Sequence, residues 1–163
     1  IYTLSLHDAL PIYQPVFEPL VEAAEQGRYV IALLADRDLS SSGVEAPLCG
    51  RAAHVAAGPA AVAERLGLPL YAATVHYERL TGARRRAAGG PWGVVIALHR
   101  VPAPPGLTGR EAVAERTRAW VERIGPELAA HAVDWHMLQA VFDDDLDPER
   151  LARSRARERE GRA

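Results

Sequence analysis

The sequence predicts an α/β fold in which helices flank a mixed, mostly parallel sheet. Apolar runs of strand length alternate along the chain with amphipathic segments of helix length, an order typical of α/β domains. The first such run, 29–35, is apolar throughout, which indicates a strand covered on both faces. With 163 residues, 48% of them hydrophobic, the chain is long enough to form one domain with a core.

Glycine and proline delimit the elements of the first half of the chain. We expect a short helix over 15–27, because Gly27 stands where a helix would end. After the strand over 29–35, a polar loop should continue to about Pro47. A second helix over 60–66 follows Gly58-Pro59, since proline favours the first helical position.

In the second half, two apolar runs flank an Arg- and Gly-rich segment. They predict strands over 69–77 and 92–99, joined as a long hairpin. A helix over 110–124 should break or kink at Gly125-Pro126 and restart over 127–132.

Composition excludes several classes of function. The formal net charge is −2, so no overall basic field indicates a nucleic-acid partner. Cys49 is the single cysteine, which excludes an internal disulfide and the common cysteine-rich zinc sites, and we expect no metal. No run approaches the roughly 18 to 20 apolar residues that a transmembrane helix needs.

The two ends of the chain differ in composition from the part between them. Residues 1–12 resemble a translated sequencing adapter, so we exclude them, and the His7-Asp8 pair, from the fold. Residues 13–148 are expected to form the domain. The Arg- and Glu-rich residues 149–163 should be a charged tail, helical or disordered.

Ionisable side chains follow the first predicted strand. Asp36, Arg37 and Asp38 leave the apolar run directly, and Glu45 follows in the same polar segment. Open α/β sheets commonly place their sites at this end of a strand, where partial desolvation tunes pKa values for acid–base chemistry. A structural network of salt bridges and caps on a surface loop is an equally good interpretation.

Two further clusters of polar residues have weaker signals. Arg84, Arg85 and Arg86 form the one basic cluster, and they suit anionic headgroups or phosphates as well as a solvated hairpin tip. Ser40 to Ser42 lack the G-x-S-x-G elbow of a serine hydrolase. We interpret His76 and His99, near strand ends, as isolated structural residues.

Several segments in a fixed order resemble one enzyme family. A-D-R-D-L at 35–39, S-G-V-E at 42–45, A-A-G-P-A-A-V-A-E-R-L-G at 56–67, G-L-P-L at 67–70 and D-W-H-M-L-Q-A-V-F at 134–142 resemble the actinobacterial phosphatidylinositol mannoside acyltransferases. These enzymes belong to the wider lipid A lauroyl/myristoyl acyltransferase branch. The resemblance extends over about 13–148.

This resemblance implies a lysophospholipid acyltransferase-like fold and a peripheral enzyme at the cytoplasmic face of the plasma membrane. Such an enzyme transfers a fatty acyl group from acyl-CoA, a co-substrate, to a mannose hydroxyl of a phosphoinositide glycolipid, without a cofactor. A histidine of an H-x-x-x-x-D/E motif acts as general base. By resemblance Glu45 is the carboxylate that approaches this histidine, whereas Asp36, Arg37 and Asp38 shape the pocket or hold the acceptor.

The chain departs from the family in one respect. None of its six histidines is followed five residues later by Asp or Glu. We therefore expect a C-terminal half, truncated at the N-terminus, that exposes an unusually large apolar face. A non-catalytic lipid- or acyl-CoA-binding domain is the alternative. His136 is interpreted as part of a packed helix end, with Trp135, Met137 and Phe142 in the core.

Overall fold

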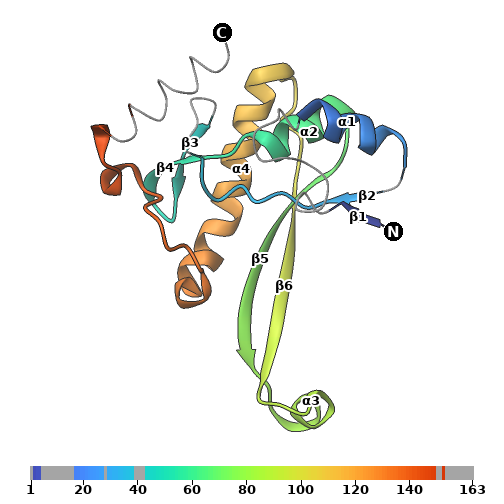
Figure 1. The fold of residues 1–163 in the computed structure, drawn as a ribbon, viewed down its shortest axis with the longest axis vertical. Coiled ribbons are helices and arrows are strands. Elements are labelled where there is room, and N and C mark those ends of the chain that lie inside the picture. Colours follow the sequence, from blue (N-terminus) through green and yellow to red (C-terminus); the bar gives the residue numbers. More distant parts are fainter. Residues whose placement is uncertain (1, 5–16, 28, 39–42, 150–151, 153–163) are drawn as a thin grey trace.

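The long helix α4 (Gly109–Ala130) is the element around which most of the chain packs (Figure 1). The computed structural model describes residues 2–4, 17–27, 29–38, 43–149 and 152. Within them the other elements are β1 (Tyr2–Leu4), α1 (Phe17–Glu25), β2 (Tyr29–Ile31), β3 (Val44–Leu48), β4 (Arg51–Val55), α2 (Gly58–Leu66), β5 (Leu70–Arg79), α3 (Gly82–Ala88), β6 (Trp92–Val101), and the short 3₁₀ helices η1 (Ala132–Asp134) and η2 (Asp143–Asp145). The predicted α/β class is confirmed.

The inner face of α4 follows the helical repeat. Its buried residues recur three or four positions apart, which places them along one side of the helix. They are Ala112, Arg116, Thr117, Trp120, Val121, Ile124 and Gly125. The helix contacts α2 and strands β3, β5 and β6, so it joins both halves of the chain.

The predicted break at Gly125-Pro126, with a restart over 127–132, is wrong, because α4 continues through Pro126 to Ala130. The predicted alternative, a kink at this place, stays a prediction. A residue with a Cβ before proline is pushed out of the helical region by the proline ring, but glycine has no Cβ to clash. Gly125 therefore permits the helix to continue. Beyond it, Leu128 lies against the core, and the His131 amide donates to the Glu127 carbonyl at the helix end.

Strands β3 and β4 form a hairpin where a polar loop to Pro47 is predicted, so that prediction is wrong for residues 44–47. The two-residue turn is Cys49-Gly50, and both residues have positive φ, 51° and 82°. Such turns match the twist of antiparallel strands, but Asn or Asp normally occupies the first position. Pro47 is tolerated because, among the described residues, β3 pairs only with β4.

Strands β5 and β6 form the long antiparallel hairpin that the sequence predicts, in register from Leu70–Val101 to Arg79–Trp92. The connection contains the short helix α3 instead of a simple loop. Figure 1 shows the hairpin extending away from the body of the molecule, with α3 at its far end.

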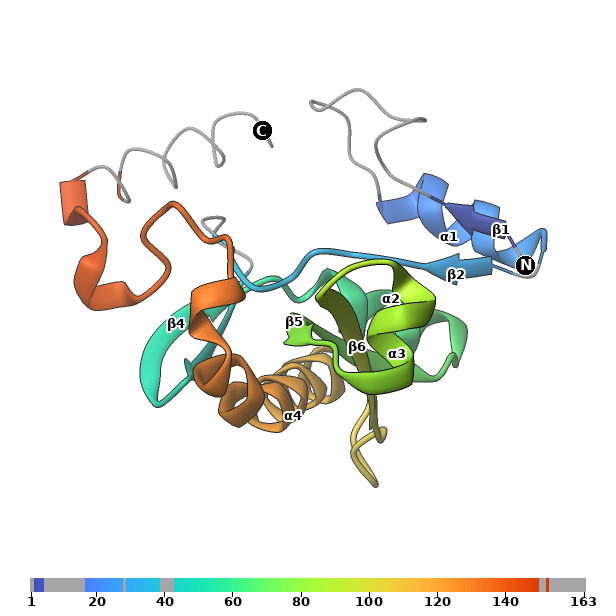
Figure 2. The same cartoon turned by 90° about the horizontal axis from the view of Figure 1, so that it is seen from below.

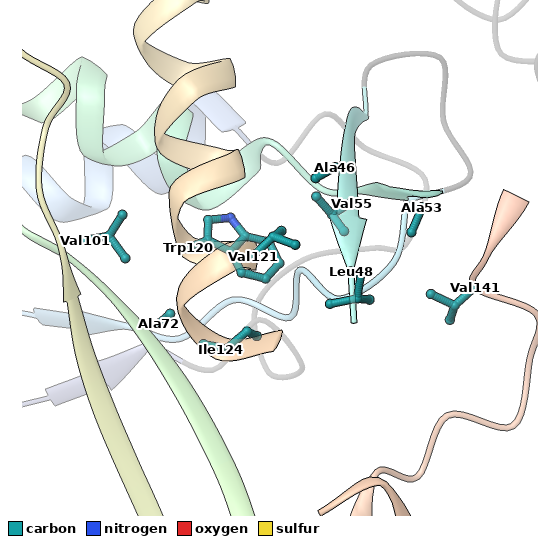
Figure 3. Packing of buried hydrophobic residues seen from close by; sticks show 10 residues of the cluster. All are labelled: Ala46, Leu48, Ala53, Val55, Ala72, Val101, Trp120, Val121, Ile124 and Val141. Carbon is teal, nitrogen blue, oxygen red and sulfur yellow. The ribbon is translucent and has the colours of Figure 1, made fainter. Parts of the chain in front are cut away.

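The core lies on either side of α4 (Figure 3). Trp120, Val121 and Ile124 project from α4 into the space between two hairpins. These are the base of the long hairpin, β5–β6, and the small hairpin, β3–β4. The strands contribute Ala46, Leu48, Ala53 and Val55 on one side and Ala72 and Val101 on the other, and Val141 closes the cluster from the C-terminal segment. Leu48, Val55, Val101 and Val121 are almost fully buried.

A buried arginine ties the base of the long hairpin to α4. Arg116 is 5% exposed, and its Nη2 donates to the carbonyls of Leu68, 3.2 Å away, and Val101, 3.3 Å away. Burial lowers the pKa of this guanidinium. Next to it, α2 ends as predicted, with Gly67 in the left-handed conformation at φ 64°.

The predicted mostly parallel sheet is not formed by the described residues. Strands β1 and β2 are parallel, whereas β3–β4 and β5–β6 are antiparallel, and each described sheet has two strands. The turn between β3 and β4 is too short for a parallel crossover. The run 29–35 is also not covered on both faces, since Leu34 is 91% exposed.

After β2 the chain crosses the molecule towards β4 (Figure 2), and this course positions the acidic residues.

None of the helices in the described ranges is both long and apolar enough to cross a bilayer. The predicted adapter (apart from 2–4), the serines 40–42 and most of the tail after 149 lie outside the described residues.

Candidate functional site

Residues 35–38, which carry Asp36, Arg37 and Asp38 and which we call the acidic segment, lie alongside β4. The Ala56 amide donates to the Ala35 carbonyl over 3.1 Å, and the Asp38 amide donates to the His54 carbonyl over 2.8 Å. These bonds hold residues 35–38 extended next to the end of the strand. Backbone pairing, and not a loop cap, therefore positions this segment.

Asp36 has a structural partner in the C-terminal segment. The indole Nε1 of Trp135 donates to Asp36 Oδ2 over 2.9 Å, across 99 positions of sequence. Both side chains are partly buried, so the ionised carboxylate strengthens this bond. The structural interpretation of Asp36 thus gains direct support, whereas its predicted role in substrate binding stays a prediction.

Arg37 and Asp38 are both partly buried. Arg37 Nε is buried and has no hydrogen-bond partner among the described residues. At Gly43 a Cβ would lie 2.7 Å from Asp38 Oδ2, so the approach of the two segments needs glycine there. The structure therefore brings Asp38 close to the start of β3, which carries Glu45.

Glu45 lies on β3, exposed to solvent, and not on a loop as predicted. Its register partner on β4 is His54, so both side chains stand on the same face of the small hairpin. The neighbouring pair, Ala46 and Ala53, is buried on the other face. Glu45 is consequently open to a group that approaches from outside.

The imidazole of His54 is held by a carboxylate that the sequence did not predict. His54 Nδ1 lies 2.9 Å from Asp143 Oδ1, and the two side chains are 24% and 31% exposed. A carboxylate on one ring nitrogen fixes the orientation of the ring and leaves the other nitrogen free. His54 and Asp143 therefore form a histidine–carboxylate pair directly opposite Glu45.

Aromatic and charged contacts hold the segment that carries Asp143. Phe142 bridges to Ala53 of β4, and the Arg51 guanidinium lies 4.2 Å from the centre of its ring. Arg51 Nη2 also donates to Asp145 Oδ1 over 2.9 Å. Two features of the sequence could have indicated the His54–Asp143 pair: the alternating R-A-A-H-V of β4 and the acidic run after Phe142. Because the two residues are 89 positions apart, neither feature connects them.

The D-W-H-M segment is only partly as predicted. Trp135, Met137 and Phe142 do pack against the core, and Trp135 and Phe142 meet edge to face at 6.5 Å. His136 is exposed, and the segment after η1 is irregular, so the predicted packed helix end is wrong for His136. The position of Trp135 is fixed by its hydrogen bond to Asp36 and not by packing within a helix.

Arg84, Arg85 and Arg86 lie in α3, at the end of the long hairpin furthest from the acidic segment (Figure 1). Arg84 pairs with Glu78, which lowers the pKa of Glu78 and raises that of Arg84. Arg85 and Arg86 are exposed. The fold thus separates the predicted arginines from the predicted carboxylates, and their role in substrate binding stays a prediction.

A second cluster joins the long hairpin to α4 through one carboxylate, so His76 and His99 are not isolated. His99 Nε2 donates to Glu127 Oε2 over 2.8 Å, and His76 Nδ1 lies 3.6 Å from Oε1. The buried Thr74 hydroxyl approaches the same group outside ordinary hydrogen-bond geometry. Thr74 and His99 hold the pKa of Glu127 below its ordinary value, against partial desolvation. His131 stacks on His76 at 3.6 Å.

Neither carboxylate cluster has the arrangement of a metal site: within the described ranges no three His, Cys, Asp or Glu side chains are placed to hold an ion. A surface depression of about 400 Å³ lies on α4, lined by Ala119, Glu122, Arg123 and Pro126. It includes none of the predicted site residues. The chemistry therefore places the candidate site at Asp36, Asp38, Glu45, His54 and Asp143, on an open surface.

The candidate site lies within the part of the chain that is similar to known proteins. The model of a family described as bacterial lipid A biosynthesis acyltransferase matches residues 5–143. The phosphatidylinositol mannoside acyltransferases of Mycobacterium tuberculosis (strain H37Rv) and Mycolicibacterium smegmatis are each 34% identical to the chain, over 144 and 140 residues. The aligned parts are 88% and 86% of this chain but 40% of each relative, so the chain spans about two fifths of the length of these curated relatives.

Proposed function

Because the chain belongs to the bacterial lipid A biosynthesis acyltransferase family, we propose that it provides the carboxylate-bearing part of an acyl-transfer site. The reaction would move a fatty acyl group from acyl-CoA to a mannose hydroxyl of a phosphatidylinositol mannoside, at the cytoplasmic face of the membrane. The relatives that carry this name support the choice of acceptor. The observation that carries the proposal is the convergence of the acidic segment, β3 and the C-terminal segment on β4.

Glu45 has the central role in this proposal. Acyl transfer to a hydroxyl needs a base that removes the hydroxyl proton, and an imidazole base needs a carboxylate to fix its tautomer and stabilise its cation. Glu45 is exposed and is therefore available to an imidazole from outside the described residues. In a complete site the three two-stranded sheets, β1–β2, β3–β4 and β5–β6, would belong to one mixed sheet of the lysophospholipid acyltransferase type.

His54 is the register partner of Glu45, and it offers a second position for the base. Asp143 occupies its Nδ1, so Nε2 is the nitrogen left for chemistry. We assign His54 and Asp143 to positioning this face, because the family base belongs to an H-x-x-x-x-D/E motif that the chain does not contain. An experiment separates the two assignments.

The test places residues 13–148 in the full-length M. smegmatis relative, in exchange for the aligned segment. Transfer from a long-chain acyl-CoA to detergent-solubilised phosphatidylinositol mannoside is then measured. Glu45→Gln should lower kcat by roughly 100-fold or more, since the imidazolium loses its partner. Glu122→Gln, an exposed carboxylate on α4, is the matched control and should keep the activity.

His54→Gln should lower kcat much less than Glu45→Gln does. If His54→Gln is as damaging as Glu45→Gln, His54 is the base and our assignment is wrong. If the chimera folds by circular dichroism and binds acyl-CoA but transfers nothing, while the intact relative is active, the non-catalytic binding domain replaces our proposal.

A further inference from the structure

The long hairpin exposes a row of apolar side chains on its outer face, in addition to Ala72 and Val101, which its inner face adds to the core. Side chains alternate between the two faces of a strand, and a sheet normally turns the apolar set towards the core. Here the inner face carries Thr74, His76 and His99, which lie towards Glu127 of α4. The outer face, which we call the hairpin face, consists of Tyr71, Val75, Tyr77, Trp92, Val94, Ile96 and Leu98, each at least half exposed.

The hairpin face is continuous, because its residues are paired across the two strands. Val75 is opposite Ile96, and Tyr77 is opposite Val94. Ile96 is 65% exposed and Leu98 67% exposed. Scattered apolar side chains are normal on a surface, but a contiguous patch of this kind marks a binding surface.

Arginines border the hairpin face at both ends. At the far end the Arg79 guanidinium lies 4.8 Å from the centre of the Trp92 ring, and at the near end Arg100 is opposite Tyr71. Beyond Trp92, α3 adds Arg85 and Arg86, and no described carboxylate pairs with either of them. The apolar surface therefore ends in aromatic rings and cations.

The charge of this element is opposite to that of the rest of the chain. Residues 70–101 contain five arginines and one acidic residue, Glu78, so they carry +4. Since the whole chain carries −2, the remaining residues carry −6. The positive charge is thus concentrated on the element that extends from the body (Figure 1).

We propose that the hairpin face docks on an anionic lipid surface. Val94, Ile96 and Leu98 enter the boundary between headgroups and acyl chains, where Trp92 and Tyr77 suit the interface. Arg85 and Arg86 bind lipid phosphates, which guanidinium groups bind in a bidentate manner. The proposal rests on the proposed function, whose acceptor is a membrane lipid, and names the element that reaches the membrane.

The charges favour a membrane over a second copy of the chain. A second copy would place one +4 hairpin against another, because a symmetric interface pairs the same surface with itself. An anionic bilayer instead attracts every arginine on this element, within the Debye length of its surface. Aromatic rings beside arginines are typical of the interfacial layer of membranes.

The test measures co-sedimentation of the full chain with vesicles of phosphatidylglycerol and phosphatidylcholine, compared with vesicles of phosphatidylcholine alone. The chain should prefer the anionic vesicles, and about 0.5 M salt should weaken binding. The double variant Arg85→Ala/Arg86→Ala should bind the anionic vesicles at least roughly tenfold more weakly. Ile96→Glu should have a comparable effect, because it places a charge in the apolar layer.

Matched controls remove equivalent groups elsewhere. Arg110→Ala/Arg123→Ala deletes two exposed arginines of α4, and Leu138→Glu charges a leucine that is 96% exposed. Both should bind vesicles like the unsubstituted chain. Trp92 emission should shift to the blue with anionic vesicles, a change that Trp92→Phe abolishes.

Equal loss of binding in the controls and the hairpin variants would overturn the proposal, as would the absence of a preference for anionic vesicles. So would a chain that ignores vesicles and forms dimers that Ile96→Glu dissociates, since a second copy would then cover the face. Because this assay needs no turnover, and the Glu45 assay uses solubilised acceptor, the two proposals fail separately.

Discussion

Asp36 shows at the scale of a single residue how a predicted ligand can have a structural partner. Its carboxylate accepts the Trp135 indole hydrogen 2.9 Å away, and this bond links the end of the acidic segment to the chain beyond η1. The residue pattern A-D-R-D-L predicts ionisable groups at this place, but it contains no information about a tryptophan 99 positions later. The local sequence therefore predicts the carboxylate of Asp36, whereas its partner, Trp135, follows only from the fold.

The contribution of this bond to stability can be measured with a double-mutant cycle of Asp36→Ala and Trp135→Phe. We expect a coupling free energy of about 1–2 kcal/mol, because the donor meets an ionised and partly buried acceptor. Urea unfolding of the four proteins at neutral pH gives the value. A coupling near zero would show that Asp36 is free for other partners.

At the scale of elements, the sequence predicted those structures whose signals are local. Proline at the start and glycine at the end delimit α2, and two apolar runs around a glycine-rich segment predicted the long hairpin. The β3–β4 hairpin was missed because Cys49, at φ 51°, is not a usual turn residue. Residues 44–47 consequently read as a continuation of the polar loop.

Helix α4 depends on the order Gly125-Pro126. A Cβ at position 125 meets nothing closer than the Cys49 amide nitrogen at 3.5 Å, an ordinary contact, so the proline ring decides the effect of a substitution. Gly125→Ala should lower the free energy of unfolding by about 1 kcal/mol. In a Pro126→Ala background, the same substitution should raise it by up to about 1 kcal/mol, because alanine favours helix over glycine.

Thermal unfolding of the two single variants and the double variant tests this change of sign. Pro126→Ala alone should stabilise, by about 1–3 kcal/mol, since the exposed proline lacks the amide that would bond back along the helix. Additive effects of the two substitutions would mean that the ring of Pro126 does not constrain residue 125.

At the scale of the whole molecule, Glu127 connects the long hairpin to the helix at the centre of the fold. Thr74, His76 and His99 all approach its carboxylate, and they belong to strands that the sequence predicted correctly. Their alternation placed them on one face of the hairpin, but nothing in the sequence showed that this face would meet position 127. The same limit applies to His54 and Asp143, which are 89 positions apart.

The lowered pKa of Glu127 gives this connection a pH dependence. A carboxyl group whose pKa is lower in the folded chain stabilises the fold above its ordinary value of 4.5, and this stabilisation is lost as the pH falls through the lowered value. The unsubstituted chain should therefore be more stable than Glu127→Gln at about pH 7, and the difference should shrink below about pH 4. Urea unfolding at several pH values gives both curves.

Glu122→Gln is the matched control, since Glu122 is exposed on the same helix and pairs with no described imidazole. Its curve should run parallel to that of the unsubstituted chain. A Glu127→Gln curve that also runs parallel over this range would contradict the connection.

Cys49 has a practical consequence for work on the molecule. It is the only cysteine, its Sγ donates to the Gly125 carbonyl over 3.5 Å, and burial raises the pKa of its thiol. At neutral pH it should therefore alkylate slowly, because the thiolate is the reactive species. A second cysteine at an open position, for example Leu98→Cys, would react much faster with a maleimide. A single fluorophore or spin label can then be attached to the hairpin while the native thiol stays in its turn.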